Sequence, residues 1–134
     1  MTTAATSPAA RHLVVEPFDG TVTATFSDAV IASTDRALIL RESGHEPVFY
    51  IPFVDIYFDF LEKTGTTTIC PLKGQASYWR ASAVGSAAED AMWAYRTPKP
   101  EAAGIAGHGA FDLSKVRIEA IPAPDRQHTP HIVE

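Results

Sequence analysis

The sequence is short of cysteine and of basic side chains, and each shortage excludes a class of protein. Its 134 residues include one cysteine, Cys70. A single cysteine excludes a disulfide framework and any zinc site built from several thiolates. With 11 basic against 16 acidic residues the net charge is −5. We therefore expect no nucleic-acid partner, because phosphate binding requires a basic face.

Long apolar runs are also missing. No stretch approaches the roughly 20 apolar residues that a membrane-spanning helix needs. Residues 1–10 lack the basic start and apolar centre of a secretory signal. These absences predict a cytoplasmic protein with no membrane partner.

The sequence shows no pattern typical of a metal site or a cofactor. Its five histidines have no ligand spacing. Asp55 and Asp59 would lie roughly 13 Å apart on one strand face, which is too far for one metal ion. We expect no metal and no cofactor.

The length and the hydrophobic content of 46% suit one domain with its own core. Residues 1–10 are small and polar and are predicted to form a disordered tail. A single mainly β domain is expected over 11–122. From residue 123 to 134 the composition is that of a polar C-terminal tail.

Short β-type segments follow one another at close spacing, separated by Gly, Pro and Asp. The clearest has Val22, Ala24 and Phe26 on one face and threonines on the other. Similar segments span 12–16, 29–33, 36–42, 48–51, 55–60, 64–70, 75–82, 87–95 and 116–121, and a further β region opens at Phe111. The pattern predicts a compact, mainly β domain of two antiparallel sheets with one or two short helices.

Local turn chemistry adds two more predictions. Pro71 and Gly74 favour a tight hairpin over 70–74, because Pro71 fixes φ and Gly74 tolerates positive φ. Prolines at the start and glycines at the end favour a short helix over 99–106.

The hairpin also contains the clearest candidate for a reactive group, the thiol of Cys70. Lys73 across the turn would lower the pKa of the Cys70 thiol and make it a nucleophile. In the alternative, Cys70 is a small buried apolar residue and Lys73 lies in solvent.

Basic and aromatic side chains supply the candidate binding groups. Arg41 in an apolar strand either reaches into a pocket to bind a carboxylate or phosphate, or forms an ion pair at a sheet edge. The aromatic residues either wall a pocket or fill the core; they are Tyr50, Tyr57, Tyr78, Trp79, Trp93 and Tyr95. Alternation places Tyr78 and Trp79 on opposite faces, and Trp93 and Tyr95 on one face.

An ordered set of motifs connects these segments: Arg36-Ala37-Leu38 with Arg41-Glu42, Tyr50-Ile51-Pro52 with Asp55, Cys70-Pro71-Leu72-Lys73-Gly74 with Ser77-Tyr78-Trp79, and Ala91-Met92-Trp93-Ala94-Tyr95 with Pro98. From about Val14 to Ile121 the chain resembles the bacterial and fungal domain-of-unknown-function family numbered 427. The resemblance implies a compact, mainly β domain similar to the β-tent folds. It implies one shared pocket lined or supported by Arg41, Glu42, Tyr50, Cys70, Lys73, Tyr78, Trp79, Trp93 and Tyr95.

Two attributes linked to such proteins do not carry over to this chain. Many β-tent proteins hold zinc through paired cysteine motifs, whereas this chain has only Cys70. Some relatives carry a nucleotidyltransferase-like label. The Gly-Ser and paired-aspartate pattern that places two magnesium ions for that reaction is missing here. The resemblance supplies no reaction.

The sequence predicts a small pocket protein that binds a small organic anion through Arg41, Lys73 and tyrosine hydroxyls. As a metal-free enzyme it would use Lys73 or Cys70 as the reactive group, with Glu42 or a tyrosine handling protons. The alternative is a non-catalytic interaction module whose motif residues hold the fold together. The sequence does not distinguish a monomer from a homodimer.

Overall fold

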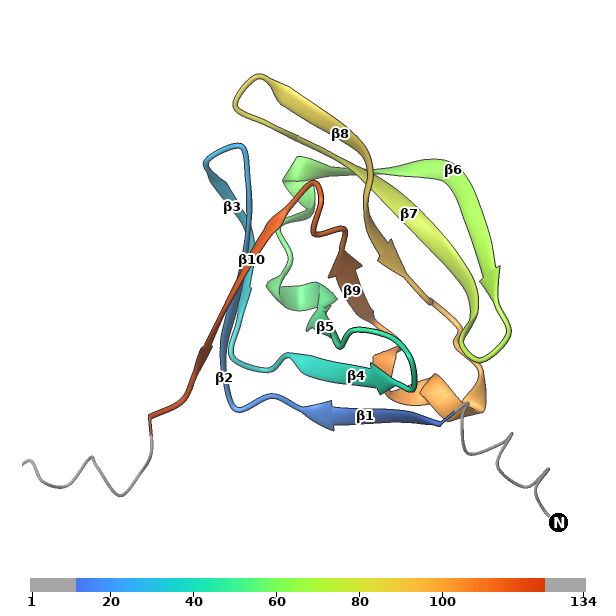
Figure 1. Cartoon of the computed structure of the whole chain (residues 1–134). Coiled ribbons are helices and arrows are strands. Elements are labelled where there is room, and N and C mark those ends of the chain that lie inside the picture. Colours follow the sequence, from blue (N-terminus) through green and yellow to red (C-terminus); the bar gives the residue numbers. More distant parts are fainter. Residues whose placement is uncertain (1–11, 125–134) are drawn as a thin grey trace, which may run out of the picture.

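A computed structural model describes residues 12–124 as two antiparallel β-sheets that do not close into a barrel (Figure 1). The larger sheet has seven strands, in the order β1 (Leu13–Pro17), β4 (Leu38–Glu42), β5 (Val48–Pro52), β9 (His108–Phe111), β8 (Ser86–Ala94), β7 (Gly74–Ala83) and β6 (Leu61–Cys70). The smaller sheet has the order β10 (Arg117–Pro122), β2 (Gly20–Phe26) and β3 (Ala29–Thr34). The predicted mainly β, two-sheet fold is confirmed.

Tight hairpins join several of these strands. Ser27 and Asp28 both have positive φ, 48° and 69°, between β2 and β3. Val84 and Gly85 do the same between β7 and β8, with φ of 49° and 74°. Two consecutive positive φ values give the turn the twist of the flanking strands, so each pair of strands continues without splaying.

The predicted hairpin at 70–74 is confirmed. Cys70 pairs with Gly74 across the turn, and Gly74 has a φ of +107°. The Lys99 backbone N–H donates to the Lys73 carbonyl at 3.0 Å, and Lys99 Nζ donates to the Pro71 carbonyl at 2.8 Å. These bonds hold the turn, and therefore Lys73, in one place.

The main core lies between the two sheets. Val22, Ala24 and Phe26 are all buried in it, as the alternation in that strand predicts. On the larger sheet, Trp79 packs edge-on against Phe53 and Phe58, with ring centroids 6.2 and 6.3 Å away. A second cluster lies under the candidate site and contains Leu40, Tyr50, Ala76, Tyr95, Ala102, Ile105 and Ala110.

The strand predicted over 55–60 is wrong. The chain there forms two short 3-10 helices, η2 (Phe53–Asp55) and η3 (Phe58–Phe60), and only Ile56 makes an isolated bridge, to Ala32. Asp55 accepts a hydrogen bond from Thr34 at 2.6 Å and fixes this segment against the end of β3. A contact between distant parts of the chain thus overrides the local alternation.

The short helix predicted over 99–106 is found as η4 (Pro100–Ile105), which is 3-10 in type. Ala102 departs from helical backbone angles at φ −117° and ψ 21°, so the segment is two short turns. Its Gly104 lies 3.4 Å, measured from an ideal Cβ, from the Val15 side chain and lets η4 pack on β1.

The predicted tail at 1–10 lies outside the described residues, as does nearly all of the tail at 123–134. Among the residues that are described, no helix has the length and apolar character to cross a membrane.

We predict that Gly20→Ala lowers the free energy of unfolding by roughly 2–3 kcal/mol. Gly20 has a φ of +154°, and an added Cβ would meet the Ile121 carbonyl and lie 2.8 Å from the Pro122 Cα. Both are backbone atoms of β10 that cannot rotate away. The matched control is Gly65→Ala, where nothing lies within 4 Å. Urea unfolding measures both, and equal stability of the two variants would contradict the prediction.

Candidate functional site

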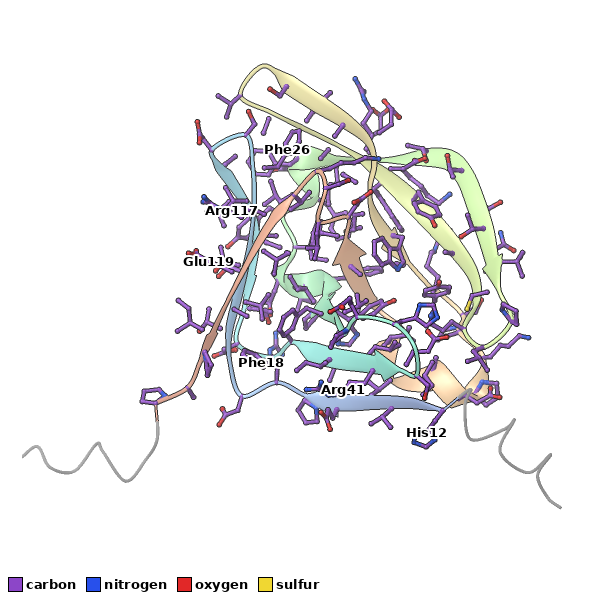
Figure 2. All side chains as sticks on the ribbon, viewed as in Figure 1. His12, Phe18, Phe26, Arg41, Arg117 and Glu119 are labelled. Carbon is purple, nitrogen blue, oxygen red and sulfur yellow. The ribbon has the colours of Figure 1, made fainter. Side chains whose placement is uncertain are left out.

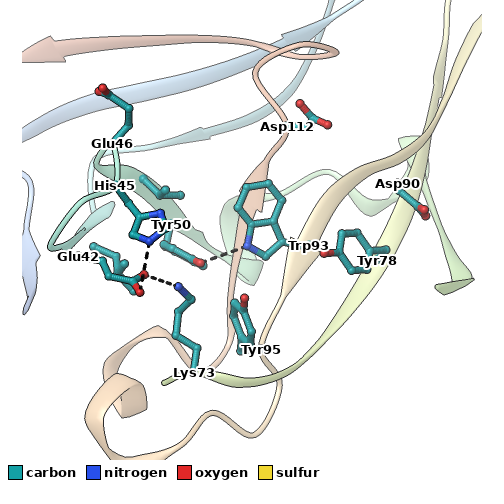
Figure 3. Close-up of a pocket in the computed structure, with 12 residues that line it drawn as sticks. Glu42, His45, Glu46, Tyr50, Lys73, Tyr78, Asp90, Trp93, Tyr95 and Asp112 are labelled. Carbon is teal, nitrogen blue, oxygen red and sulfur yellow. Dashed lines mark hydrogen bonds and ion pairs between the residues drawn. The ribbon is translucent and has the colours of Figure 1, made fainter. Parts of the chain in front are cut away.

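A hollow of about 420 Å³ lies on the larger sheet, between the β4–β5 arm and the β7–β8 arm (Figure 3). We call it the Lys73–Glu42 pocket. Most of the predicted site residues line it: Glu42, Tyr50, Lys73, Tyr78, Trp93 and Tyr95. Its volume is that of a small-molecule site.

An ion pair closes one end of the pocket. Lys73 Nζ donates to Glu42 Oε1 at 2.7 Å, and the two side chains are only 13% and 12% exposed. Glu42 ends β4, and Lys73 sits in the β6–β7 turn, so the bond spans the curve of the sheet (Figures 1 and 3). The alternative of a solvated Lys73 is therefore wrong.

Two further groups surround this pair. Lys73 Nζ lies 5.9 Å from the centroid of the Tyr95 ring, a cation–π distance. His45 Nε2 lies 3.8 Å from Glu42 Oε2 and is largely exposed. The Lys73 charge is thus already compensated by Glu42 and the Tyr95 ring.

Tyr50 and Trp93 form the floor and one wall of the pocket. Trp93 Nε1–H donates to the Tyr50 hydroxyl at 3.2 Å, and Figure 3 shows the indole nitrogen directed at it. The Tyr50 oxygen accepts this bond, so its own proton is left to donate. Burial raises the pKa of Tyr50 from 10 to about 12, and burial also raises the pKa of Tyr95. Both hydroxyls therefore stay neutral donors at physiological pH.

Asp90 enters the pocket lining through an irregularity in β8. Trp79 pairs with Met92 and Ala81 with Ala88, so three β8 residues stand opposite Arg80 alone. Asp90 has a positive φ of 52° at this bulge and accepts a hydrogen bond from Thr64 Oγ1 at 2.8 Å. Bulges re-aim side chains, and aspartate tolerates this backbone region better than most residues.

Most of the ionisable groups that line the pocket, apart from the tyrosines, are acidic. Glu42, Glu46, Asp90 and Asp112 contribute carboxylates, against Lys73 and the imidazole of His45. The Ser114 side chain and backbone N–H both donate to Asp112 and hold the pKa of its carboxyl below the usual range, so it stays ionised. Lys115 Nζ lies 3.6 Å from Asp112, whereas no ion pair within residues 12–124 reaches Asp90 or Glu46.

The remaining predicted site residues lie elsewhere. Arg41 Nε pairs with Glu16 on β1 at 2.8 Å, on the outer strands of the sheet (Figure 2). Trp79 packs in the main core, on the opposite face from Tyr78. Cys70 is half-buried against the second core cluster and does not line the pocket. The structure therefore does not bring Arg41, Trp79 and Cys70 to the hollow.

Sequence reasoning missed His45, Glu46, Asp90 and Asp112. His45 lies in the connection between β4 and β5, and its position three residues after Glu42 was the available signal. Asp90 follows Glu89 in a strand and gives no local sign of the bulge. Within 12–124 no group of three His, Cys, Asp or Glu side chains is arranged to hold a metal ion, and the metal-free expectation stays a prediction.

We predict strong energetic coupling between Lys73 and Glu42. Lys73→Met should cost about 3 kcal/mol because it leaves the Glu42 carboxylate buried without its cation. Adding Glu42→Gln should recover at least about 1 kcal/mol of that loss. The exposed pair Arg41 and Glu16, at 52% and 45%, is the matched control, with coupling below about 0.5 kcal/mol. Double-mutant cycles in urea measure both, and equal coupling in the two pairs would refute the assignment.

We predict that stability falls as the pH rises above 10. The pKa of Tyr50 is near 10 when unfolded and about 12 when folded. Between these values the unfolded chain loses the proton and the folded chain keeps it. The free energy of unfolding should then fall by up to about 1.4 kcal/mol per pH unit for this group.

Tyr50→Phe should flatten this decline when urea unfolding is repeated from pH 9 to 12. Tyr57→Phe is the control, because Tyr57 is 46% exposed and lies outside the pocket. An unchanged pH dependence in Tyr50→Phe would show that the hydroxyl ionises as freely in the folded as in the unfolded chain.

Comparison with known proteins identifies a family for the chain. No curated protein matches the sequence. The family model described as a domain of unknown function (DUF427) matches residues 14–121, which include nearly all of both sheets and every residue of the Lys73–Glu42 pocket. The chain belongs to this family, DUF427.

Proposed function

We propose that the chain binds a small organic molecule in the Lys73–Glu42 pocket and that the polar head of this molecule is cationic. One observation carries the choice of charge: carboxylates outnumber basic groups in the lining, and those of Asp90 and Glu46 have no ion-pair partner among the described residues. A cation entering the hollow is attracted by these groups, and an anion is repelled.

The walls support the same choice. Tyr50, Tyr78, Trp93 and Tyr95 surround the hollow, and the faces of such rings attract cations. Tyr78 stands directly opposite Trp93 on the neighbouring strand, and its hydroxyl is held 2.9 Å from Thr68 Oγ1. The aromatic walls are thus fixed before a ligand arrives, which reduces the entropy cost of binding.

The anionic ligand expected from the sequence depended on two free cations. Arg41 is paired with Glu16 outside the pocket, and Lys73 is paired with Glu42 inside it. An anion would have to compete with Glu42 for Lys73 while facing the other carboxylates. That ligand stays a prediction, as do the reactive roles of Lys73, Glu42 and Cys70, and the test below includes the anion.

A second function has one observation in its favour. The Lys73–Glu42 bond joins two distant parts of the curved sheet, as expected if the motif residues serve only to hold the fold together. Such a module would leave the hollow without a small-molecule ligand. Binding measurements therefore separate the two functions.

We predict that benzylamine binds at least about tenfold more tightly than benzoate, with benzyl alcohol between them. The three probes share one ring and differ in the charge of the head. Isothermal titration calorimetry at pH 7 gives the affinities. The indole N–H resonance of Trp93 reports the site, and that of Trp79 serves as an internal control because Trp79 lies in the core.

Asp90→Asn is the variant of choice, since asparagine also tolerates positive φ and can keep the bond from Thr64. This substitution should weaken the affinity for benzylamine about threefold or more and leave the affinity for benzyl alcohol unchanged. If benzoate bound most tightly of the three probes, the result would overturn the cationic ligand and support the anionic ligand expected from the sequence. No shift of the Trp93 resonance with any of the three probes at millimolar concentration would favour the structural module.

A further inference from the structure

A second hollow, of about 360 Å³, lies beside the first, between the larger sheet and β10. Its own walls are apolar: Pro47, Phe49, Phe111, Leu113, Ile118 and Ala120. Leu113 is 71% exposed at its mouth. The two sheets do not close into a barrel, and β10 runs along β2, to one side of β5 and β9 (Figure 1).

The two hollows share part of their lining. Glu46, Val48, Trp93 and Asp112 belong to both. Figure 3 shows the Trp93 indole with its nitrogen toward Tyr50 and its six-membered ring on the side of Asp112. The indole therefore divides a polar chamber, which holds Lys73 and Glu42, from an apolar chamber under β10.

We propose that both chambers hold one amphipathic amine, with its ammonium group among the carboxylates and its alkyl or aryl tail in the apolar chamber. The inference rests on the proposed function and adds the second half of the ligand. Glu46 and Asp112 stand at the boundary between the chambers, where the charged head of such a molecule meets its tail.

The charge and polarity of the chambers favour this ligand over two separate ones. Asp90 and Glu46 offer negative charge without an ion-pair partner among the described residues, on the side where aromatic faces also attract a cation. Beyond that boundary, the side chains that line the second chamber carry neither charge nor hydrogen-bonding groups. A single molecule that spans both chambers gains affinity from both, with one loss of translational freedom.

Ala120 allows the tail chamber to be blocked alone. It is an exposed residue of β10 and lines only the apolar chamber. Ala120→Phe fills space there without touching the Lys73–Glu42 pocket, and Ala120→Ser is the matched control of nearly unchanged size. Leu113→Ser, at an exposed site, removes apolar wall instead of adding bulk and serves if Ala120→Phe does not fold.

The experiment compares hexylamine with propylamine by calorimetry on the full chain. Burying three more methylene groups should tighten binding by at least about tenfold in the unaltered protein and in Ala120→Ser. Ala120→Phe, or Leu113→Ser, should remove most of this advantage and leave the affinity for propylamine unchanged. Hexanol should bind more weakly than hexylamine.

Each other outcome identifies what has failed. Equal affinity for the two amines would overturn the tail chamber and leave the proposed function standing. If hexylamine still bound more tightly than propylamine in Ala120→Phe and Leu113→Ser, the alkyl tail would lie outside the apolar chamber and the proposal would be overturned. Equal binding of hexanol and hexylamine would overturn the ammonium head, and no binding of benzylamine or of any amine would overturn the proposed function itself.

Discussion

The site depends on one ion pair, the bond between Lys73 and Glu42. In the seven-stranded sheet, β4 and β7 are separated by β5, β9 and β8, yet this bond joins the end of β4 to the turn before β7. The sheet must therefore curve, and the inner side of the curve is the pocket. Because both side chains are nearly buried, the pair is held as a unit. Its position leaves the aromatic rings and the outer carboxylates facing the hollow.

The negative charge of the pocket arises because nearby basic side chains are already paired with carboxylates. Lys73 and Arg41 are each paired with a carboxylate, and only the Lys73 pair lies in the hollow. Asp112 is kept ionised by Ser114, and the bulge in β8 adds Asp90. A chain with a net charge of −5 thus concentrates part of its excess negative charge at one concave site. Beyond Trp93, the second hollow is lined mainly by apolar side chains.

Local residue chemistry predicted the parts of the fold that depend on few residues. The hairpin at 70–74 follows from Pro71 and Gly74, and the opposite faces of Tyr78 and Trp79 follow from strand alternation. The segment at 55–60 did not follow, because a bond from Thr34 to Asp55 decides its path. Arg41 and Glu42 are neighbours in one strand and point to opposite faces, so only one of them reaches the pocket.

The irregularity at Asp90 also decides where the end of β8 lies along β7. Three residues of β8 stand opposite Arg80, so this part of the strand holds two residues more than a regular ladder needs. Because side chains alternate between the faces of a sheet with a period of two, the surplus leaves Trp93 and Tyr95 on the same face and changes only their position along the strand. A β8 without the two extra residues would keep these rings on the pocket side but would displace them by roughly 7 Å relative to β7. The place of the aromatic wall therefore depends on the length of β8 as well as on its aromatic residues.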